Sequence, residues 1–206
     1  KPSGVTVFNY GTTWKYLDNG SNQGTAWTGT GFNDASWASG AAELGYGDAP
    51  VTPVNYGPDV NNKYVTTYFR KTINISNPSS YSIFNANIRR DDGCIVYVNG
   101  TQVYISNLSG TVAFNTYATN AADDGATPQP FSIPSSAFVS GNNVIAVEMH
   151  QSSATSSDLT FDMELTANAP GAEPEILRGP LLQMVNTNAI TIRWTTSVAS
   201  DTKVWY

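Results

Sequence analysis

The chain has 206 residues and a formal net charge of −6, with few charged residues (13%) and many aromatic ones (12%). The acidic balance argues against binding to nucleic acid or to anionic membrane surfaces, because neither would attract such a chain. No apolar run approaches about 18 residues, so we expect no transmembrane helix. The only cysteine, Cys94, excludes a disulfide framework, and we expect its thiol to be buried and inert.

Helical periodicity is nearly absent, and strand signals recur between turn residues, which favours an all-β protein. The first long β-rich run covers residues 64–75, and its apolar odd positions share one side of the expected strand. A second run follows at 84–89, with alternating apolar residues. The side chains expected to share one side of each run are Val65, Phe69, Ile73 and Ile75 in the first, and Phe84, Ala86 and Ile88 in the second.

The clearest local signal is Asn99-Gly100, which lies between two runs of β-formers. A two-residue type I′ turn requires positive φ at both positions, which Asn and Gly tolerate, so we predict a hairpin over 95–105. In this register Val98 pairs with Thr101, and Val96 pairs with Val103. The prediction places Val96, Val98 and Val103 on one face and Ile95, Tyr97, Gln102 and Tyr104 on the other.

Two further strands are predicted at 143–150 and 158–165. In the first, Glu148 and His150 share a side with Val144 and Ala146, opposite Ile145, Val147 and Met149. In the second, the apolar positions point inward and the polar positions form a solvated outer face. The inward residues are Leu159, Phe161, Met163 and Leu165, and the outward ones are Asp158, Thr160, Asp162 and Glu164.

Residues 167–174 contain two prolines and no periodic apolar side chains, which indicates a linker. We therefore expect a first domain at 1–168, a linker at 169–175 and the start of a second domain at 176–206. In that second domain we expect strands at 181–185 and 189–194 around the turn 186–188, and a further strand from 201 to 206. An immunoglobulin-type sandwich needs about 100 residues, so this domain is expected to be incomplete.

The second segment carries a resemblance to a known family. Leu-Arg-Gly-Pro-Leu-Leu-Gln-Met-Val (177–185), followed by Ile-Thr-Ile-Arg-Trp (190–194), resembles the start of the fibronectin-III-like domain that precedes the catalytic domain in purple acid phosphatase-like metallophosphoesterases. The resemblance covers residues 178–206. It implies a downstream catalytic domain with a two-metal phosphoesterase centre that lies outside this chain.

The first segment carries a second resemblance. Its motifs are Trp27, 32–37 (Phe-Asn-Asp-Ala-Ser-Trp), 44–48 (Leu-Gly-Tyr-Gly-Asp), 68–71 (Tyr-Phe-Arg-Lys), 90–93 (Arg-Asp-Asp-Gly), 97–100 (Tyr-Val-Asn-Gly) and 141–148 (Gly-Asn-Asn-Val-Ile-Ala-Val-Glu). In this order they resemble the galactose-binding-domain-like jelly rolls attached to secreted bacterial hydrolases, including sugar-binding domains of β-glycosidases. The resemblance covers residues 14–165. It implies a jelly-roll β-sandwich and a secreted or cell-surface bacterial protein; Asn33 departs from the pattern, where an Asp is commoner.

Catalytic motifs are absent from the sequence. A two-metal phosphoesterase centre takes several histidines, and His150 is the only one here. No Gly-x-Ser-x-Gly elbow accompanies it. The acidic pairs Asp91-Asp92 and Asp123-Asp124 are adjacent residues that point to opposite faces of a strand, so neither pair forms a glycosidase couple by itself. We therefore expect no catalytic residue in this chain.

Binding residues can still be predicted. Sugar sites combine aromatic rings with hydrogen-bonding side chains, and calcium takes six to eight oxygens from carboxylates and carbonyls. The candidate ligand-binding residues are Tyr97, Tyr104, Arg89, Arg90, Glu148 and His150, and the candidate calcium ligands are Asp91, Asp92 and Asp158.

The sequence thus predicts a non-catalytic binding or docking module of a secreted metallophosphoesterase. Its partners would be the downstream catalytic domain and a glycan, with no nucleic acid, no membrane insertion and no cofactor other than structural calcium. Two alternatives stay open. The chain could be a carbohydrate-binding accessory domain of a secreted glycoside hydrolase, with 176–206 in an unrelated sandwich, or it could be a structural spacer without a ligand.

Overall fold

A computed structural model describes residues 4–121, 124–169, 176–186 and 189–196. Their backbone contacts divide the chain into two compact units, with the division between residues 169 and 170. The described residues form strands and three short 3-10 turns, Ala26–Thr28, Pro78–Ser80 and Ser135–Ala137, without an α-helix. Accordingly, no helix in the described part of the chain has the length and apolar character needed to cross a membrane.

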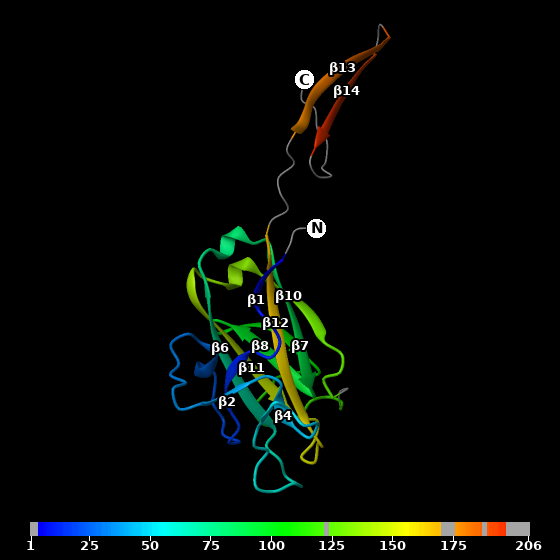
Figure 1. Ribbon diagram of the computed structural model, residues 1–206. Helices are drawn as coiled ribbons and strands as arrows, with labels where there is room; N and C mark the ends of the chain where they lie inside the picture. The colour runs from blue at the N-terminus through cyan, green and yellow to red at the C-terminus, as the bar shows by residue number, and fades with distance from the viewer. Residues whose placement is uncertain (1–3, 122–123, 170–175, 187–188, 197–206) are drawn as a thin grey trace. The chain divides into compact units, whose positions relative to one another are not determined.

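The first unit is a β-sandwich of two six-stranded sheets, which we name sheet A and sheet B (Figure 1). Sheet A has the order β10-β7-β12-β4-β5, and β1 pairs with the far end of β12. Sheet B has the order β3-β2-β6-β11-β8-β9. The strands of sheet A are β1 (Val5–Phe8), β4 (Leu44–Tyr46), β5 (Thr52–Pro53), β7 (Ile83–Asp91), β10 (Gln129–Pro134) and β12 (Leu159–Asn168). Those of sheet B are β2 (Thr13–Leu17), β3 (Ala38–Ala41), β6 (Thr66–Ile75), β8 (Gly93–Val98), β9 (Thr101–Ser106) and β11 (Gly141–His150).

The two sheets meet across one hydrophobic core. Phe69 of sheet B stacks on Phe161 of sheet A with 4.2 Å between ring centroids, and Trp14 meets Phe161 edge-on at 4.9 Å. The expected alternation is confirmed on β6, β7 and β12. The confirmed core residues are Phe69, Ile73, Ile75, Phe84, Ala86, Ile88, Leu159, Phe161, Met163 and Leu165. Cys94 is also fully buried in this core, and burial raises the pKa of its thiol to about 12.

The hairpin of β8 and β9 corrects part of the predicted register. Asn99 and Gly100 have φ of 51° and 89°, and Val98 pairs with Thr101 as expected. Val96, however, pairs with Tyr104 and not with Val103, because the register shifts by one residue between Val96 and Tyr97. A β-bulge of this kind moves the following side chains to the other face of the strand.

As a result, Tyr104 packs against the core between the sheets, where its ring stacks on Phe131 at 4.1 Å. Tyr97 instead packs on the outer face of sheet B. The two tyrosines were predicted on the same face, and that prediction is wrong.

The outer face of β12 is a second correction. Its polar side chains were expected to be solvated, but Asp158, Thr160 and Asp162 are buried. The cause is a set of loops that close over this face. The backbone N–H of Gly11 donates to both carboxylate oxygens of Asp162, at 3.0 and 3.2 Å. Alternation along a strand cannot reveal such a cover, because the covering residues are distant in the sequence.

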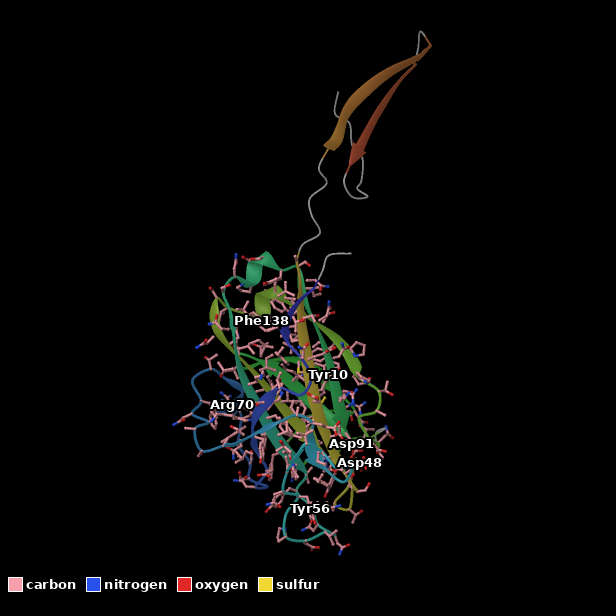
Figure 2. All side chains as sticks on the ribbon, in the orientation of Figure 1. Tyr10, Asp48, Tyr56, Arg70, Asp91 and Phe138 are labelled. Carbon is pink, nitrogen blue, oxygen red and sulfur yellow. The ribbon has the colours of Figure 1, made fainter. Side chains whose placement is uncertain are left out.

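Loops also cover the outer face of sheet B. The segment between β2 and β3 places Trp27 and Trp37 against Tyr68, Val144 and Ala146, which forms a second hydrophobic cluster. Arg70 holds this segment in place (labelled in Figure 2). Its side chain is 2% exposed, and its guanidinium pairs with Asp34 at 2.9 Å and donates to the carbonyl of Trp27. Both faces of β11 are therefore buried.

The second unit contains β13 (Ile176–Asn186) and β14 (Ala189–Thr196), which pair antiparallel. The strands expected at 181–185 and 189–194 are therefore present. Part of the expected turn at 186–188 lies outside the described residues. The linker from residue 170 and the expected strand at 201–206 lie wholly outside them.

Candidate binding sites

A pocket opens on the outer face of sheet B, where loops from two parts of the chain meet the strands. It has a volume of about 310 Å³. Loop residues come from the segment 22–28, which ends in the 3-10 turn Ala26–Thr28, and from the segment 112–114. Strand residues come from β6, β8 and β11. The side chains that give it its character are Trp27, Tyr68, Tyr97, Phe114 and Glu148.

The aromatic side chains of the pocket pack on one another. Trp27 meets Tyr68 edge-on at 4.8 Å and Tyr97 at 5.8 Å between ring centroids. The indole N–H of Trp27 donates to the carbonyl of Gly24 at 3.1 Å, which satisfies its one polar atom. Trp27 is only 1% exposed, so it supports the wall of the pocket and offers little free surface.

Glu148 supplies the only carboxylate among the residues that line this pocket. Its Oε1 accepts a hydrogen bond of 2.7 Å from the phenol of Tyr97. Burial, and then the charge of Glu148, raise the pKa of Tyr97, so the phenol stays a neutral donor. Burial likewise raises the pKa of Tyr68 to about 12.

His150 lies next to Glu148 on the same side of β11. Its Nδ1 is 2.7 Å from the carbonyl oxygen of Thr116, and a carbonyl can only accept, so Nδ1 carries the hydrogen. Its Nε2 is 3.6 Å from Oε2 of Glu148, and an ion pair forms there only when the ring is protonated. The ring is fully buried, and its hydrogen bond to Thr116 holds the loop that contains this residue.

This arrangement suits the binding of a small polar ligand with an apolar face. Aromatic side chains offer a surface for such a face, and a carboxylate accepts hydrogen bonds from hydroxyl groups. Glycoside hydrolysis needs two carboxyl groups that flank the scissile bond. The described residues that line the pocket provide one, Glu148.

The structure thus brings together Tyr97, Glu148 and His150, and it places the other predicted ligand-binding residues elsewhere. Tyr104 faces the core. Arg89 lies on β7 of sheet A, where its guanidinium is 5.3 Å from the centroid of the Tyr10 ring. Arg90 donates to the carbonyl of Asp92 at 2.6 Å and to the hydroxyl of Ser106 at 3.1 Å. These hydrogen bonds hold the backbone around Asp92 in place.

A cluster of acidic side chains lies where three loops meet the end of sheet A. Asp48 follows β4, Asp124 precedes β10 and Asp158 precedes β12. One carboxylate oxygen from each lies within 4.8 Å of the others. Of the predicted calcium ligands, this cluster includes Asp158, and it adds two that sequence reasoning did not select.

The other two predicted ligands have different environments. Asp92 accepts hydrogen bonds from the N–H of Ser152 at 2.6 Å and from the hydroxyl of Ser156 at 3.2 Å, so it fastens the loop after β11. Asp91 is 2% exposed, and its Oδ2 has no hydrogen-bond partner. Burial raises the pKa of Asp91 to about 8, and the charges of Asp92 and Asp158 act in the same direction. Figure 2 labels Asp91 and Asp48, which lie at the same end of the sandwich.

Sequence reasoning missed Trp27 and Tyr68 as pocket residues and Asp48 and Asp124 as cluster members. A signal existed for the acids, because both lie beside a glycine, Gly47 and Gly125, that has positive φ. The neighbouring glycines could not show, however, which loops come together in the fold. The position of Trp27 in both a hydrophobic cluster and a pocket wall follows only from the loop fold.

Comparison with known proteins found no family model and no curated protein that matches the sequence. Solved structures do match the fold. Bacteroides uniformis beta-glucuronidase 2, covalently bound to cyclophellitol-6-carboxylate aziridine, has a TM-score of 0.53 and 17% identity over 80% of this chain and 18% of its own. Bacteroides uniformis beta-glucuronidase has 0.52 and 18%, with the same coverage. A beta-glucuronidase from glycoside hydrolase family 2 has 0.50 and 16%, over 90% of this chain and 20% of its own.

The chain spans about a fifth of the length of these proteins, and identities this low show a shared fold alone. They also correct the first family assignment. The prediction of an N-terminal module of a purple acid phosphatase-like metallophosphoesterase is wrong, since the matching folds belong to β-glucuronidases. Among the described residues, the motif that carried it lies on the paired strands β13 and β14. Such a pattern specifies a hairpin and does not identify the domain beyond it.

Proposed function

We propose that residues 1–168 form a carbohydrate-binding accessory domain of a glycoside hydrolase, with a jelly-roll, galactose-binding-like topology. The observation that carries this proposal is the pocket on sheet B, in which Tyr97 and Glu148 lie beside aromatic walls. The fold shared with domains of β-glucuronidases is consistent with it. The module would hold a sugar while a separate domain performs hydrolysis.

The geometry suggests which sugars to expect. A volume of about 310 Å³ is at the small end of ligand pockets, so it suits one sugar residue. Glu148 can accept hydrogen bonds from sugar hydroxyls, whereas its negative charge disfavours an acidic sugar. Neutral hexoses should therefore bind more tightly than glucuronate, even though the matched enzymes are β-glucuronidases.

Titration of the 206-residue chain with methyl glycosides of galactose, glucose and glucuronate, followed by NMR and tryptophan fluorescence, tests the proposal. We expect saturable binding of a neutral glycoside that Glu148→Gln weakens at least about tenfold, the scale for a lost charge-assisted hydrogen bond. Tyr104→Phe is the control, because Tyr104 faces the core. Binding that Glu148→Gln leaves unchanged would place the sugar elsewhere.

One observation favours a second function, a structural spacer without a ligand. The pocket's aromatic rings already pack on one another, and Trp27 and Tyr68 are nearly fully buried. Absence of binding for every glycoside at millimolar concentration would favour the spacer over the binding module.

The remaining expectations are part of the same proposal. Residues 169–175 would link the first domain to a second β-sandwich, to which the hairpin of β13 and β14 belongs. An isolated two-stranded hairpin is only marginally stable in water, which favours a larger partner structure. The chain would be secreted or displayed at a cell surface, where its partners are glycans and the catalytic domain of the same polypeptide. Structural calcium is proposed separately, from the acidic cluster.

A further inference from the structure

Three acidic residues that are distant in the sequence meet at one end of sheet A. Asp48, Asp124 and Asp158 come from three different loops, and one carboxylate oxygen of each lies within 4.8 Å of the others. Like charges at this spacing repel one another. An acidic cluster alone does not define a site, so its neighbours decide what the arrangement means.

Two glycines allow the loops to approach this closely. Gly47 has φ of +98°, and a Cβ on it would lie 2.5 Å from Cβ of Asp158. Gly125 has φ of +68°, and its Cβ would lie 2.5 Å from Cγ2 of Thr160. Any side chain at either position would push its loop off β12. The backbone is therefore built to keep the flanking acids, Asp48 and Asp124, near Asp158.

A fourth carboxylate near the cluster, that of Asp91, has a buried oxygen atom without a hydrogen bond. Asp91 pairs with Thr160 of β12, two residues from Asp158, and its Oδ2 is buried without a hydrogen bond. The charges of Asp158 and Asp124 both act on it. Native proteins leave few buried polar atoms unpaired, because each costs about 1–3 kcal/mol.

A second unpartnered atom lies close by. The phenol oxygen of Tyr46 is buried without a hydrogen bond, and Tyr46 pairs with Leu159 next to Asp158. Burial, and then the charges of Asp158 and Asp91, raise the pKa of this phenol, so it is a neutral donor or ligand. Two buried oxygen atoms at the same end of the sheet thus lack a hydrogen-bond partner or a ligand contact. A cation or its bound water supplies such a contact.

We propose that Asp48, Asp124 and Asp158 bind one calcium ion, which fastens three loops to the end of sheet A and whose bound water reaches the buried oxygens of Asp91 and Tyr46. The ligand atoms are all oxygen, which suits a hard cation and not zinc or copper. Oxygens on opposite sides of calcium are about 4.6–5.2 Å apart, whereas those around magnesium are about 4.0–4.2 Å apart. The carboxylate oxygens of the cluster all lie within 4.8 Å of one another, which is close enough for them to share one such ion.

Isothermal titration of the chelator-treated 206-residue chain with CaCl₂ tests this site, independently of carbohydrate binding. We expect one site per chain with a dissociation constant below about 1 mM, and weaker binding of Mg²⁺. At about ten times that constant the midpoint of thermal unfolding should rise by about 3–6 °C.

Asp48→Asn and Asp124→Asn are the decisive variants, because both side chains are exposed and their loss should not prevent folding. Each should weaken calcium binding at least about tenfold and reduce the thermal shift. Asp59→Asn is the matched control, since Asp59 is an exposed loop acid that caps only the N–H of Asn61. The proposal is overturned if the wild-type chain binds no calcium at millimolar concentration, or if the decisive variants bind it as tightly as the control.

Discussion

Tyr97 of β8 donates a hydrogen bond of 2.7 Å to Glu148 of β11, across two neighbouring strands of sheet B. Tyr97 pairs directly with Ala146, so Glu148 is its diagonal neighbour on the same face. Glu148 is 9% exposed, and the bond therefore satisfies a carboxylate that is largely removed from water. The same contact positions the acceptor that we propose for a sugar.

Tyr97→Phe removes this donor and leaves Oε1 of Glu148 without its partner. We expect the free energy of unfolding to fall by about 1–3 kcal/mol, the cost of an unsatisfied buried acceptor. Urea denaturation measures it. Tyr104→Phe serves as the control and should cost less than about 0.5 kcal/mol, because its hydroxyl makes no hydrogen bond with the described residues. Equal effects of the two variants would show that the Tyr97 bond contributes nothing.

Gly100→Val tests the turn between β8 and β9. Gly100 has φ of +89°, and a Cβ there would meet only Gly29 and Thr28, both at 3.8 Å. The cost therefore comes from the backbone conformation and not from a clash, and we expect about 1–3 kcal/mol of destabilisation.

Gly31→Val is the matched control for that turn. Gly31 is exposed and lacks a positive φ, and a Cβ added to it would meet nothing within 4 Å. Its substitution should change the free energy of unfolding by less than about 0.5 kcal/mol. If Gly100→Val were as neutral as this control, the type I′ turn would be misassigned.

Asp162 should make the stability depend on pH. Burial is the main cause that raises the pKa of Asp162, and the charge of Glu43 raises it further. The N–H groups of Gly11 and Met163 and the charge of Arg89 lower this pKa, but their effect is smaller than the increase. The folded state then holds a proton that the unfolded state releases near pH 3.8. Stability from this group is complete below that pH and is lost as the pH rises through the folded pKa.

The measurement is the free energy of unfolding of wild type and Asp162→Asn from about pH 4 to about pH 7. The wild type should lose stability relative to the variant as the pH rises, by at most about 1.4 kcal/mol per pH unit. The carboxamide oxygen of Asn still accepts from Gly11, so the fold should persist. A difference that grows in the opposite direction would contradict the raised pKa.

Tyr104→Ala tests the reassignment of Tyr104 to the core. Its ring stacks on Phe131 at 4.1 Å and 11°, which joins β9 of sheet B to β10 of sheet A. We expect a loss of about 2–4 kcal/mol in the free energy of unfolding, somewhat below a fully buried aromatic. Glycoside and calcium binding should be unchanged in the folded variant. Loss of sugar binding alone, with full stability, would return Tyr104 to the pocket.

Local sequence patterns predicted the strands β6–β9, β11 and β12 of the first unit but not β1–β5 or β10. Alternation placed Leu159, Phe161 and Met163 in the core, and Asn99-Gly100 located the hairpin. These are local properties, because a strand repeats every two residues and a type I′ turn depends on two positions. The placement of Glu148 and His150 on the same side of β11 followed from the same rule.

The covered outer faces and the meeting of distant side chains became visible in the folded sandwich alone. The bulge before Tyr97 moved Tyr104 into the core, and loops buried Asp158 and Asp162 on a face that alternation predicted to be solvated. The acidic cluster joins Asp48 to Asp158 across more than half of the first domain. Such contacts depend on how loops close over a finished sandwich, and no periodicity within a single strand records them.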